Sequence, residues 1–236
     1  MSSLNKKLSI IIPVYNEKHT IQKILNKIYN LKNLKKEIIV VNDASSDGTK
    51  EILNTNKKKI THLIHHKKNL GKGAAIQTAK KFIKGDVVII QDADLEYDPG
   101  DYMKLLNLII KGNNVVYGSR VLGKNRYLSK NFSSILRIFY NHMLTLLSNI
   151  INNQKLTDAH TCYKMFSSKI FLNIQLKEKD FSFCPEITTK ISNMKIDIIE
   201  TPISYEGRNY KNGKKIRFKD AIEAIKTLIK YKFLKK

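Results

Sequence analysis

The chain has 236 residues, of which 42% are hydrophobic and 27% are charged, so it is long and apolar enough to fold around a core of its own. Its two cysteines, Cys162 and Cys184, show no ligand-like spacing, which excludes a disulfide scaffold and a CxxC metal site and favours a reducing compartment. A formal net charge of +23 indicates anionic partners, such as nucleic acid, an anionic membrane surface or phosphorylated substrates.

Arginine supplies only five of the 43 basic residues, whereas lysine, isoleucine and asparagine are abundant. This bias is typical of an A/T-rich genome, so part of the positive charge carries no functional information. Because proteins that read bases usually do so with bidentate arginine, we predict that the chain does not bind nucleic acid. No apolar run reaches the roughly 18 residues of a spanning helix, and the run over 8–12 is too short for a signal peptide. We therefore expect a cytoplasmic protein.

Short apolar runs alternate with helical patterns over the first 118 residues. The runs predict buried strands, and the intervening patterns, such as the one over 19–31, predict helices. The expected strands cover residues 8–14, 37–42, 61–66, 86–91 and 114–119. This alternation predicts an α/β fold with a mainly parallel sheet and helices on both faces. In such folds, ligands bind beyond the carboxyl ends of the strands.

The pattern changes after Gly118, where amphipathic and apolar-rich helices become more prominent. We predict helices over 132–151, 185–193 and 218–233, and strands over 161–166 and 196–205. No linker-like composition separates the two halves, so we expect a single domain over residues 1–236.

Residues 86–101 hold six of the 20 acidic residues and no basic residue, which is a local reversal of the overall charge. Asp92, Asp94 and Glu96 directly follow a predicted strand. Alternate residues of an extended segment point the same way, so we expect these carboxylates to converge. Converging carboxylates repel one another unless a cation joins them, and hard oxygen ligands suit Mg²⁺ or Mn²⁺. The alternative is a solvated acidic loop.

Motifs at the ends of the predicted strands resemble those of a known family. In chain order they are PVYNE, VNDASSDGT, NLGKGAA, QDADLEYDP and GSR, followed later by LTDAHTCYK, PEIT and ISYEGRNYKNGKKI. Together they resemble family 2 glycosyltransferases with the Rossmann-like GT-A fold. The greatest similarity is to the branch of dolichyl-phosphate mannose synthases and polyprenyl-phosphate glycosyltransferases. The resemblance covers about residues 8–233.

The resemblance implies a nucleotide-sugar site in the first half, over 1–120. Residues implied to contact the nucleotide sugar are Pro13, Tyr15, Glu17, Asp43, Lys72 and Asp92. Asp92, Asp94 and Glu96 are implied to hold a divalent metal, and Arg120 is implied to neutralise the diphosphate. Asn42 stands where the family often has a second aspartate, so base identity stays open. Glu96 stands where relatives often have glutamine.

The second half, over 121–236, is implied to bind the acceptor. Asp158 is the one carboxylate between Gly118 and Lys177. A hydroxyl acceptor needs a general base, for which Asp158 is the candidate, whereas an ionised phosphate acceptor needs none. The other candidate acceptor contacts are Tyr163, Lys164, Tyr205, Arg208 and Tyr210. His160 and Cys184 depart from the family pattern, and we interpret His65 and His66 as residues without a functional role at the end of a strand.

The chemistry agrees with this resemblance on independent grounds. Sugar transfer from a nucleoside diphosphate builds negative charge on the leaving group, and a metal and fixed cations stabilise that charge. Other nucleotide motifs are absent from the sequence, since it contains no GxxxxGK[ST] loop and no GxGxxG after the first strand.

Two predicted helices offer membrane contacts. Residues 207–236 hold 11 basic and two acidic residues, and Phe218, Ile222, Ile225 and Ile229 recur at helical spacing. This pattern favours an interfacial helix on anionic lipid, with an ordinary terminal helix as the alternative. The apolar helix over 132–151 is a membrane contact, a core helix or a face for a homo-oligomer.

We therefore expect a metal-dependent, inverting enzyme that moves a sugar from a UDP- or GDP-sugar to a lipid. It is expected to work peripherally at the cytoplasmic face of the cell membrane. Polyprenyl phosphate is the first expected acceptor. The alternative acceptor is a lipid hydroxyl such as that of diacylglycerol, with Asp158 as base. A non-catalytic basic module that binds membrane or nucleic acid is the remaining alternative, which the acidic segment argues against.

Overall fold

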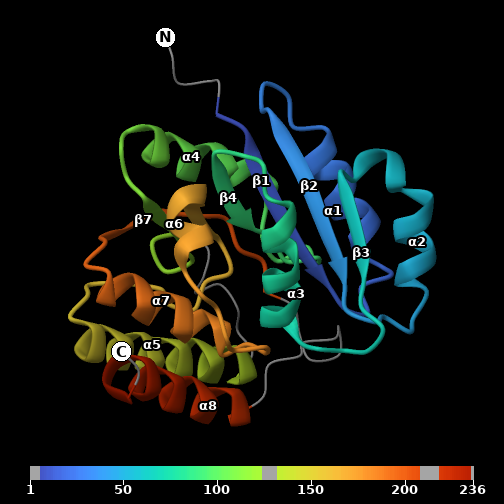
Figure 1. The fold of residues 1–236 in the computed structure, drawn as a ribbon. Helices are drawn as coiled ribbons and strands as arrows, with labels where there is room; N and C mark the ends of the chain where they lie inside the picture. The colour runs from blue at the N-terminus through green and yellow to red at the C-terminus, as the bar shows by residue number, and fades with distance from the viewer. Residues whose placement is uncertain (1–5, 124–131, 208–217, 235–236) are drawn as a thin grey trace.

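A computed structural model describes residues 6–123, 132–207 and 218–234, and a seven-stranded sheet lies at its centre (Figure 1). The strand order is β3-β2-β1-β4-β6-β5-β7, and every neighbouring pair is parallel except those that β6 makes with β4 and β5. The strands are β1 (Leu8–Val14), β2 (Lys36–Asn42), β3 (His62–His65), β4 (Val87–Ile90), β5 (Val115–Ser119), β6 (Lys164–Ser167) and β7 (Ile198–Pro202). The predicted α/β fold with a mainly parallel sheet is thereby confirmed.

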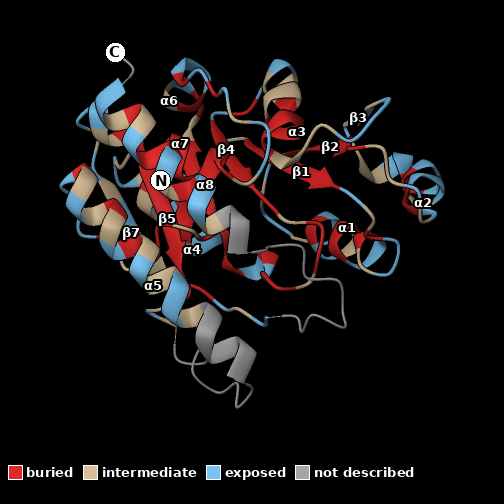
Figure 2. Ribbon diagram, turned by 90° about the horizontal axis from the view of Figure 1, so that it is seen from below, coloured by how far each residue is buried: buried red, intermediate tan, exposed pale blue. Residues whose placement is uncertain are grey.

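Strands β1 and β4 are apolar except for Ser9, because helices cover both faces of the sheet. Every residue of β1 and β4 is buried. Helix α3 (Lys72–Ala79) packs on β1 and β2, and α1 (Ile21–Tyr29) lies on the opposite face of the sheet (Figures 1 and 2). Strand β1 is the point at which the strand order reverses, with β2 on one side and β4 on the other. Ligands of open α/β sheets bind at the carboxyl ends of the strands beside such a point.

The predicted elements of the second half are also present. The helices not yet introduced are α2 (Thr49–Thr55), α4 (Tyr102–Ile110), α5 (Phe132–Asn152), α6 (Ser168–Asn173), α7 (Phe183–Asn193) and α8 (Phe218–Ile229). Short 3-10 turns, η2 (Lys57–Lys59), η3 (Lys80–Phe82) and η4 (Pro99–Asp101), lie between elements of the first half, and a π-helical turn, η7 (Lys230–Leu234), follows α8. The strand predicted over 161–166 begins only at Lys164, because residues 159–160 form a turn.

Helices α5, α7 and α8 pack against one another at the end of the molecule where the central strands terminate (Figure 1). Strands β6 and β7 come from the second half of the chain but pair with β4 and β5, so both halves share one sheet. None of the helices in the described segments combines the length and hydropathy needed to span a bilayer.

Two residues of the apolar stripe predicted for α8 are exposed in the described part of the helix. The helix buries Ala224 and Leu228, whereas Ile222 and Ile229 are both 43% exposed. Helix α5 likewise exposes several large apolar side chains, namely Phe139, Tyr140, Met143, Leu146 and Ile150. These two helices contact each other, so their exposed apolar residues lie on neighbouring elements.

Candidate active site

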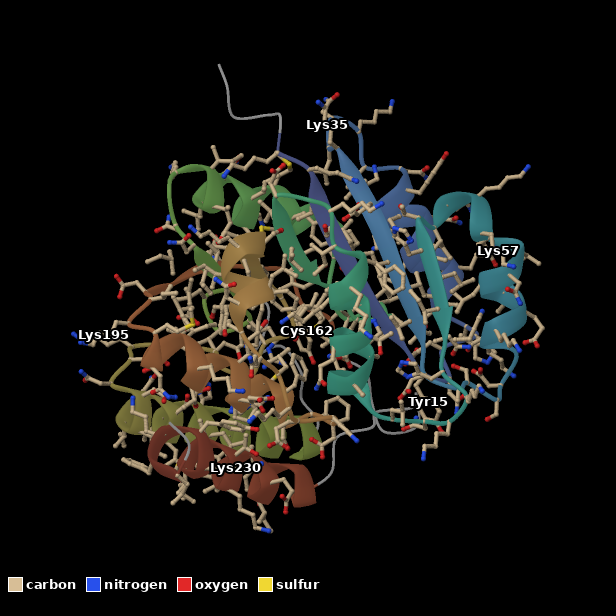
Figure 3. The ribbon with its side chains drawn as sticks, viewed as in Figure 1. Tyr15, Lys35, Lys57, Cys162, Lys195 and Lys230 are labelled. Carbon is tan, nitrogen blue, oxygen red and sulfur yellow. The ribbon has the colours of Figure 1, made fainter. Side chains whose placement is uncertain are left out.

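The candidate site lies beyond the carboxyl ends of β1, β2 and β4. Strand β1 leads through buried Pro13 to Tyr15, which is 37% exposed at the lower end of the strands (Figure 3). Glu17 is buried, its carboxylate accepts a hydrogen bond from the Thr20 hydroxyl at 2.7 Å, and its amide donates to Thr49 Oγ1 at 2.9 Å. Of these three, Tyr15 is the side chain most open to a ligand.

Asp43 organises the glycine loop that precedes α3. Its Oδ1 accepts the amide of Leu70 at 2.9 Å, and its Oδ2 accepts the amide of Gly71 at 2.7 Å. His66 Nδ1 lies 2.6 Å from Asp43 Oδ1, and His66 Nε2 lies 3.0 Å from Thr78 Oγ1. The His66 ring therefore joins Asp43 to α3, a structural contact that the sequence did not indicate.

His65 also has a partner that explains its position. Its Nδ1 lies 3.0 Å from Asn42 Nδ2, and β2 and β3 pair in a register that places Asn42 opposite His65. His65 therefore contacts Asn42 and His66 contacts Asp43, because β2 and β3 run parallel in this register. The register of β2 and β3 was the information that would have predicted these two contacts.

Lys72 is the first residue of α3, and its side chain points toward the end of β4. The ammonium group donates to Asp92 Oδ1 and lies 3.5 Å from the Cys162 sulfur, in the interior between the sheet and the helices (Figure 3). Burial favours the neutral form of Lys72, but Asp92 outweighs burial and raises the pKa of the lysine above its ordinary value. Lys72 therefore stays charged beside Asp92.

The acidic segment after β4 departs from the expected geometry. Residues 93–96 form bends rather than an extended strand, so alternate carboxylates do not share a direction. Asp92 pairs with Lys72, Asp94 Oδ1 accepts the Glu96 amide at 3.0 Å, and Glu96 Oε2 accepts the Tyr205 hydroxyl at 2.9 Å. Within the described segments, no group of three histidine, cysteine or acidic side chains is arranged as metal ligands. The expected convergence of all three carboxylates is corrected accordingly.

The donor set nevertheless fits a hard divalent cation, because every candidate ligand is a carboxylate oxygen. Mg²⁺ commonly takes only one or two protein carboxylates and completes its shell with water and substrate phosphates. A site that the substrate completes requires no preassembled cluster of three side chains.

Arg120 and Asp158 form a buried, bidentate ion pair. Arg120 Nε lies 2.7 Å from Asp158 Oδ2, Nη2 lies 2.8 Å from Oδ1, and the Arg120 amide donates to Oδ2 at 3.0 Å. The guanidinium carbon lies 5.2 Å from the centroid of the Tyr205 ring. Burial works to lower the pKa of Arg120, but Asp158 outweighs it and raises that pKa. Tyr205 thus contacts both Arg120 and Glu96 of the acidic segment.

Glu200 of β7 holds the turn that carries Asp158, and sequence reasoning did not single it out. Its Oε2 accepts the amide and the hydroxyl of Thr157 at 2.7 Å and 2.8 Å, and its Oε1 accepts the Asp158 amide at 2.9 Å. Because β7 pairs with β5, Glu200 lies opposite Tyr117, close to Arg120 at the end of β5. Only the sheet topology brings these groups together.

Two predicted acceptor contacts are interior residues. Tyr163 is fully buried and donates its hydroxyl to Gln91 Oε1 at 2.6 Å. Lys164 is fully buried, donates to the Ala159 carbonyl at 2.7 Å and lies 3.7 Å from the centroid of the Tyr117 ring. Neither side chain is exposed to an acceptor, so both predictions are corrected, whereas Tyr205 remains partly exposed. Arg208 and Tyr210 lie outside the described residues.

Comparison with known proteins identifies the class to which this fold and site belong. The model of the glycosyl transferase family 2 matches residues 9–174, so the chain belongs to this family and is a glycosyltransferase. Within the family, it is 28% identical to dolichyl-phosphate beta-glucosyltransferase ALG5A of Trichomonas vaginalis, over 94% of this chain and 72% of that protein. It is 29% identical to UDP-N-acetylglucosamine–dolichyl-phosphate N-acetylglucosaminyltransferase of Methanococcus voltae, over 84% of this chain and 85% of that protein.

Solved structures show the same fold. Glucosyl-3-phosphoglycerate synthase of Mycobacterium tuberculosis matches with a TM-score of 0.73 at 16% identity, over 98% of this chain and 82% of that chain. Its complex with Mn²⁺, UDP and glucosyl-3-phosphoglycerate matches with a TM-score of 0.68 at 15% identity, over 97% of this chain and 80% of that chain. These neighbours establish the GT-A fold of the chain.

Proposed function

We propose that the chain transfers a sugar, with inversion, from a UDP- or GDP-sugar to a lipid phosphate of the polyprenyl or dolichyl type. The observation that carries this choice of acceptor is the bidentate pair of Arg120 and Asp158. A carboxylate held by a guanidinium is a weak base, because the cation stabilises its ionised form. Such a group suits an acceptor that is already ionised, as a phosphate is, better than a hydroxyl that must lose a proton.

The names of the relatives support the same acceptor class. Both curated relatives described above are named as enzymes that act on dolichyl phosphate. A lipid hydroxyl with Asp158 as general base stays the second candidate, since Asp158 is the one carboxylate between Gly118 and Lys177. A non-catalytic binding module is set aside because the chain belongs to an enzyme family.

We further propose that carboxylates of the acidic segment hold Mg²⁺ or Mn²⁺ together with the donor. Asp92, Asp94 and Glu96 are the candidate ligands. The cation would supply positive charge to the departing diphosphate. Lys72, which stays charged, adds a fixed positive charge at the end of β4. Metal-bound neighbours of this fold, solved with Mn²⁺ or with Mg²⁺, support the choice of cation.

The apolar side chains that α5 and α8 expose support contact with a membrane surface. Ile150 is 70% exposed and Phe233, in η7, is 69% exposed, so these side chains contribute nothing to the core. The basic residues of 207–236 add attraction to anionic lipid. A peripheral position at the cytoplasmic face would bring the candidate site to its lipid acceptor.

Paired substitutions at Arg120 and Asp158 test the acceptor proposal. If Asp158 only positions the Arg120 side chain, Arg120→Gln should lower activity with polyprenyl phosphate at least as much as Asp158→Asn does. The double variant should then lose no more activity than Arg120→Gln alone. If Asp158 is the general base, Asp158→Asn alone lowers kcat by about 10²–10⁴-fold and exceeds the effect at Arg120. The second ordering would refute a purely positioning role for Asp158.

A further inference from the structure

The start of α3 is held by a loop from the second half of the chain rather than by a capping side chain. The N-cap residue Gly71 makes no side-chain cap, and the Ala74 amide donates instead to the Lys179 carbonyl at 2.9 Å. One turn further along α3, the Gln77 side-chain amide donates to the Glu178 carbonyl at 2.8 Å. The first turn of α3, which carries Lys72, is therefore docked on residues 177–180, here called the clasp loop.

Gly71 and Gly73, on either side of Lys72, pack so closely against the clasp loop that no larger residue would fit at either position. A Cβ on Gly71 would lie 2.4 Å from the Lys179 carbonyl oxygen, and a Cβ on Gly73 would lie 2.3 Å from the Glu178 carbonyl oxygen. Real Cβ atoms do not approach a backbone oxygen so closely, so the loop and the helix are in direct backbone contact. A displacement of the clasp loop therefore moves the backbone around Lys72.

The clasp loop is fixed from two sides. From α7, the fully buried carboxylate of Glu186 accepts the Lys177 amide at 2.8 Å and the Glu178 amide at 2.9 Å. From the C-terminal turn η7, Lys230 Nζ donates to Glu178 Oε1 at 2.6 Å, and the Tyr231 hydroxyl donates to the same oxygen at 2.8 Å. Glu178 thus connects η7 with α3 through its side chain and its carbonyl.

Tyr231 contributes to this connection as a buried residue and not as an exposed one. Its side chain is 2% exposed, and Lys190 lies 4.4 Å from the centroid of its ring. Burial, together with the hydrogen bond to Glu178, raises the pKa of Tyr231, so the hydroxyl keeps its proton and donates it to the carboxylate. An isolated exposed ion pair contributes little, but Glu178 joins a buried hydroxyl and an ammonium in one network.

We propose that Glu178 is a positioning residue that ties the C-terminal turn to the donor site, so that the docking of α8 and η7 sets the position of Lys72 beside Asp92. Helix α8, which exposes Ile222 and Ile229 and continues into η7, is thereby connected to the proposed nucleotide-sugar site. This inference rests on the proposed donor role of Lys72. Its structural part, the docking of α3, stands independently of that role.

Hydrogen–deuterium exchange of the full chain tests the docking. We expect Glu178→Ala and Tyr231→Phe to speed exchange of the amides over 72–77 by roughly fivefold or more, as a typical coupling between sites would. Glu178→Gln, which keeps an oxygen acceptor, should fall between Glu178→Ala and wild type. Lys226→Gln is the matched control, because Lys226 lies in α8 directly before η7 but pairs with the exposed Glu223. Unchanged exchange in folded Tyr231→Phe, which removes a single hydroxyl, would overturn the proposal.

Nucleotide titration then tests the link to Lys72. In calorimetry with UDP or GDP and Mn²⁺, the dissociation constant should rise in the order wild type, Glu178→Gln, Glu178→Ala, while Lys226→Gln stays at the wild-type value. Faster exchange with an unchanged dissociation constant would overturn the link to Lys72. A wild-type protein that binds neither nucleotide would instead contradict the proposed donor. The exchange measurement would still test whether α3 is docked on the clasp loop.

Discussion

Asp94 is the residue at which the proposed metal is tested most cleanly. Its Oδ1 accepts the Glu96 amide, and an asparagine retains that oxygen, so Asp94→Asn removes charge while it preserves the local fold. We expect turnover to fall by about 100-fold or more, as the loss of charge stabilisation in a transition state does. Turnover is measured across a Mn²⁺ titration.

Asp98→Asn is the matched control for Asp94→Asn. Asp98 belongs to the same acidic segment, but its side chain is 52% exposed and lies 3.7 Å from Lys27. We expect this variant to retain turnover near that of wild type. Full wild-type activity in excess chelator would contradict the metal requirement altogether.

Lys164 links the stability of the fold to pH. Burial lowers its pKa from 10.5 to about 8, although nearby Cys184 and Asp158 act in the opposite direction. Below pH 8 the folded protein bears the whole cost of a buried charge. Between pH 8 and 10.5 the folded chain has released a proton that the unfolded chain still holds, so stability rises with pH in this window.

We expect Lys164→Met to remove this rise, because the variant has no proton to release. The wild-type free energy of unfolding should increase relative to the variant by on the order of 3 kcal/mol across the window. Urea unfolding at a series of pH values measures the difference, and Lys169→Met, at an exposed position, is the control. Parallel pH curves for wild type and Lys164→Met would contradict a suppressed pKa at this site.

Individual contacts of the site were predictable from the sequence only in part. The motifs placed Asp43, Lys72 and Asp92 at strand ends, and the structure brings Lys72 and Asp92 into contact. The partnership of Asp43 with His66 depends on the register of β2 and β3, which a single sequence does not state. Tyr163 and Lys164 were expected at the acceptor, but the turn before β6 directs both into the interior.

At the scale of elements, strong apolar patterns were sufficient to predict the bounds of a helix or strand, and short, weak patterns were not. Strand β1 has the predicted bounds, and α5 extends one residue beyond the prediction, because long apolar patterns have few alternatives. The insertion of β6 between β4 and β5, antiparallel to both, was not predictable. A four-residue strand carries no information about its neighbours or its direction, which tertiary packing decides.

The C-terminal segment over 218–236 is the part of the chain for which membrane contact is tested. We expect replacement of Lys226, Lys235 and Lys236 by glutamine to weaken binding to anionic vesicles by roughly 100-fold, since each lysine near the surface contributes about 1 kcal/mol. Lys230 and Lys232 are retained, because they contact Glu178 and Ser192 within the protein. Vesicle sedimentation at low and high salt measures the change.

A charge-matched variant separates local from overall electrostatics. Lys32, Lys57 and Lys58 are exposed, and Lys57 lies on the far side of the molecule from Lys230 (Figure 3). Replacing these three by glutamine removes the same charge and should leave sedimentation nearly unchanged. An equal loss in both variants would mean that the overall charge, and not the C-terminal segment, attracts the lipid. Unchanged sedimentation in the C-terminal variant would shift the contact to the apolar face of α5.

At the scale of the whole molecule, both halves of the chain contribute to one site because they share one sheet. Strands β1, β2 and β4 place Tyr15, Asp43 and Asp92 at their carboxyl ends, and the second half supplies Asp158, Tyr205 and the clasp loop. The exposed helices α5 and α8 occupy the same end of the molecule as these strand ends (Figure 1). This arrangement suits a donor that arrives from solution and an acceptor that arrives from a membrane.

Transfer of a labelled sugar to defined lipids tests this account most directly. The 236-residue chain is incubated with Mn²⁺ and a panel of UDP- and GDP-sugars, with anionic vesicles that carry polyprenyl phosphate or diacylglycerol. We predict that one donor labels polyprenyl phosphate in a metal-dependent manner, that the product is a phosphodiester, and that diacylglycerol stays unlabelled. Labelled diacylglycerol with unlabelled polyprenyl phosphate would contradict the account and would assign Asp158 the role of general base.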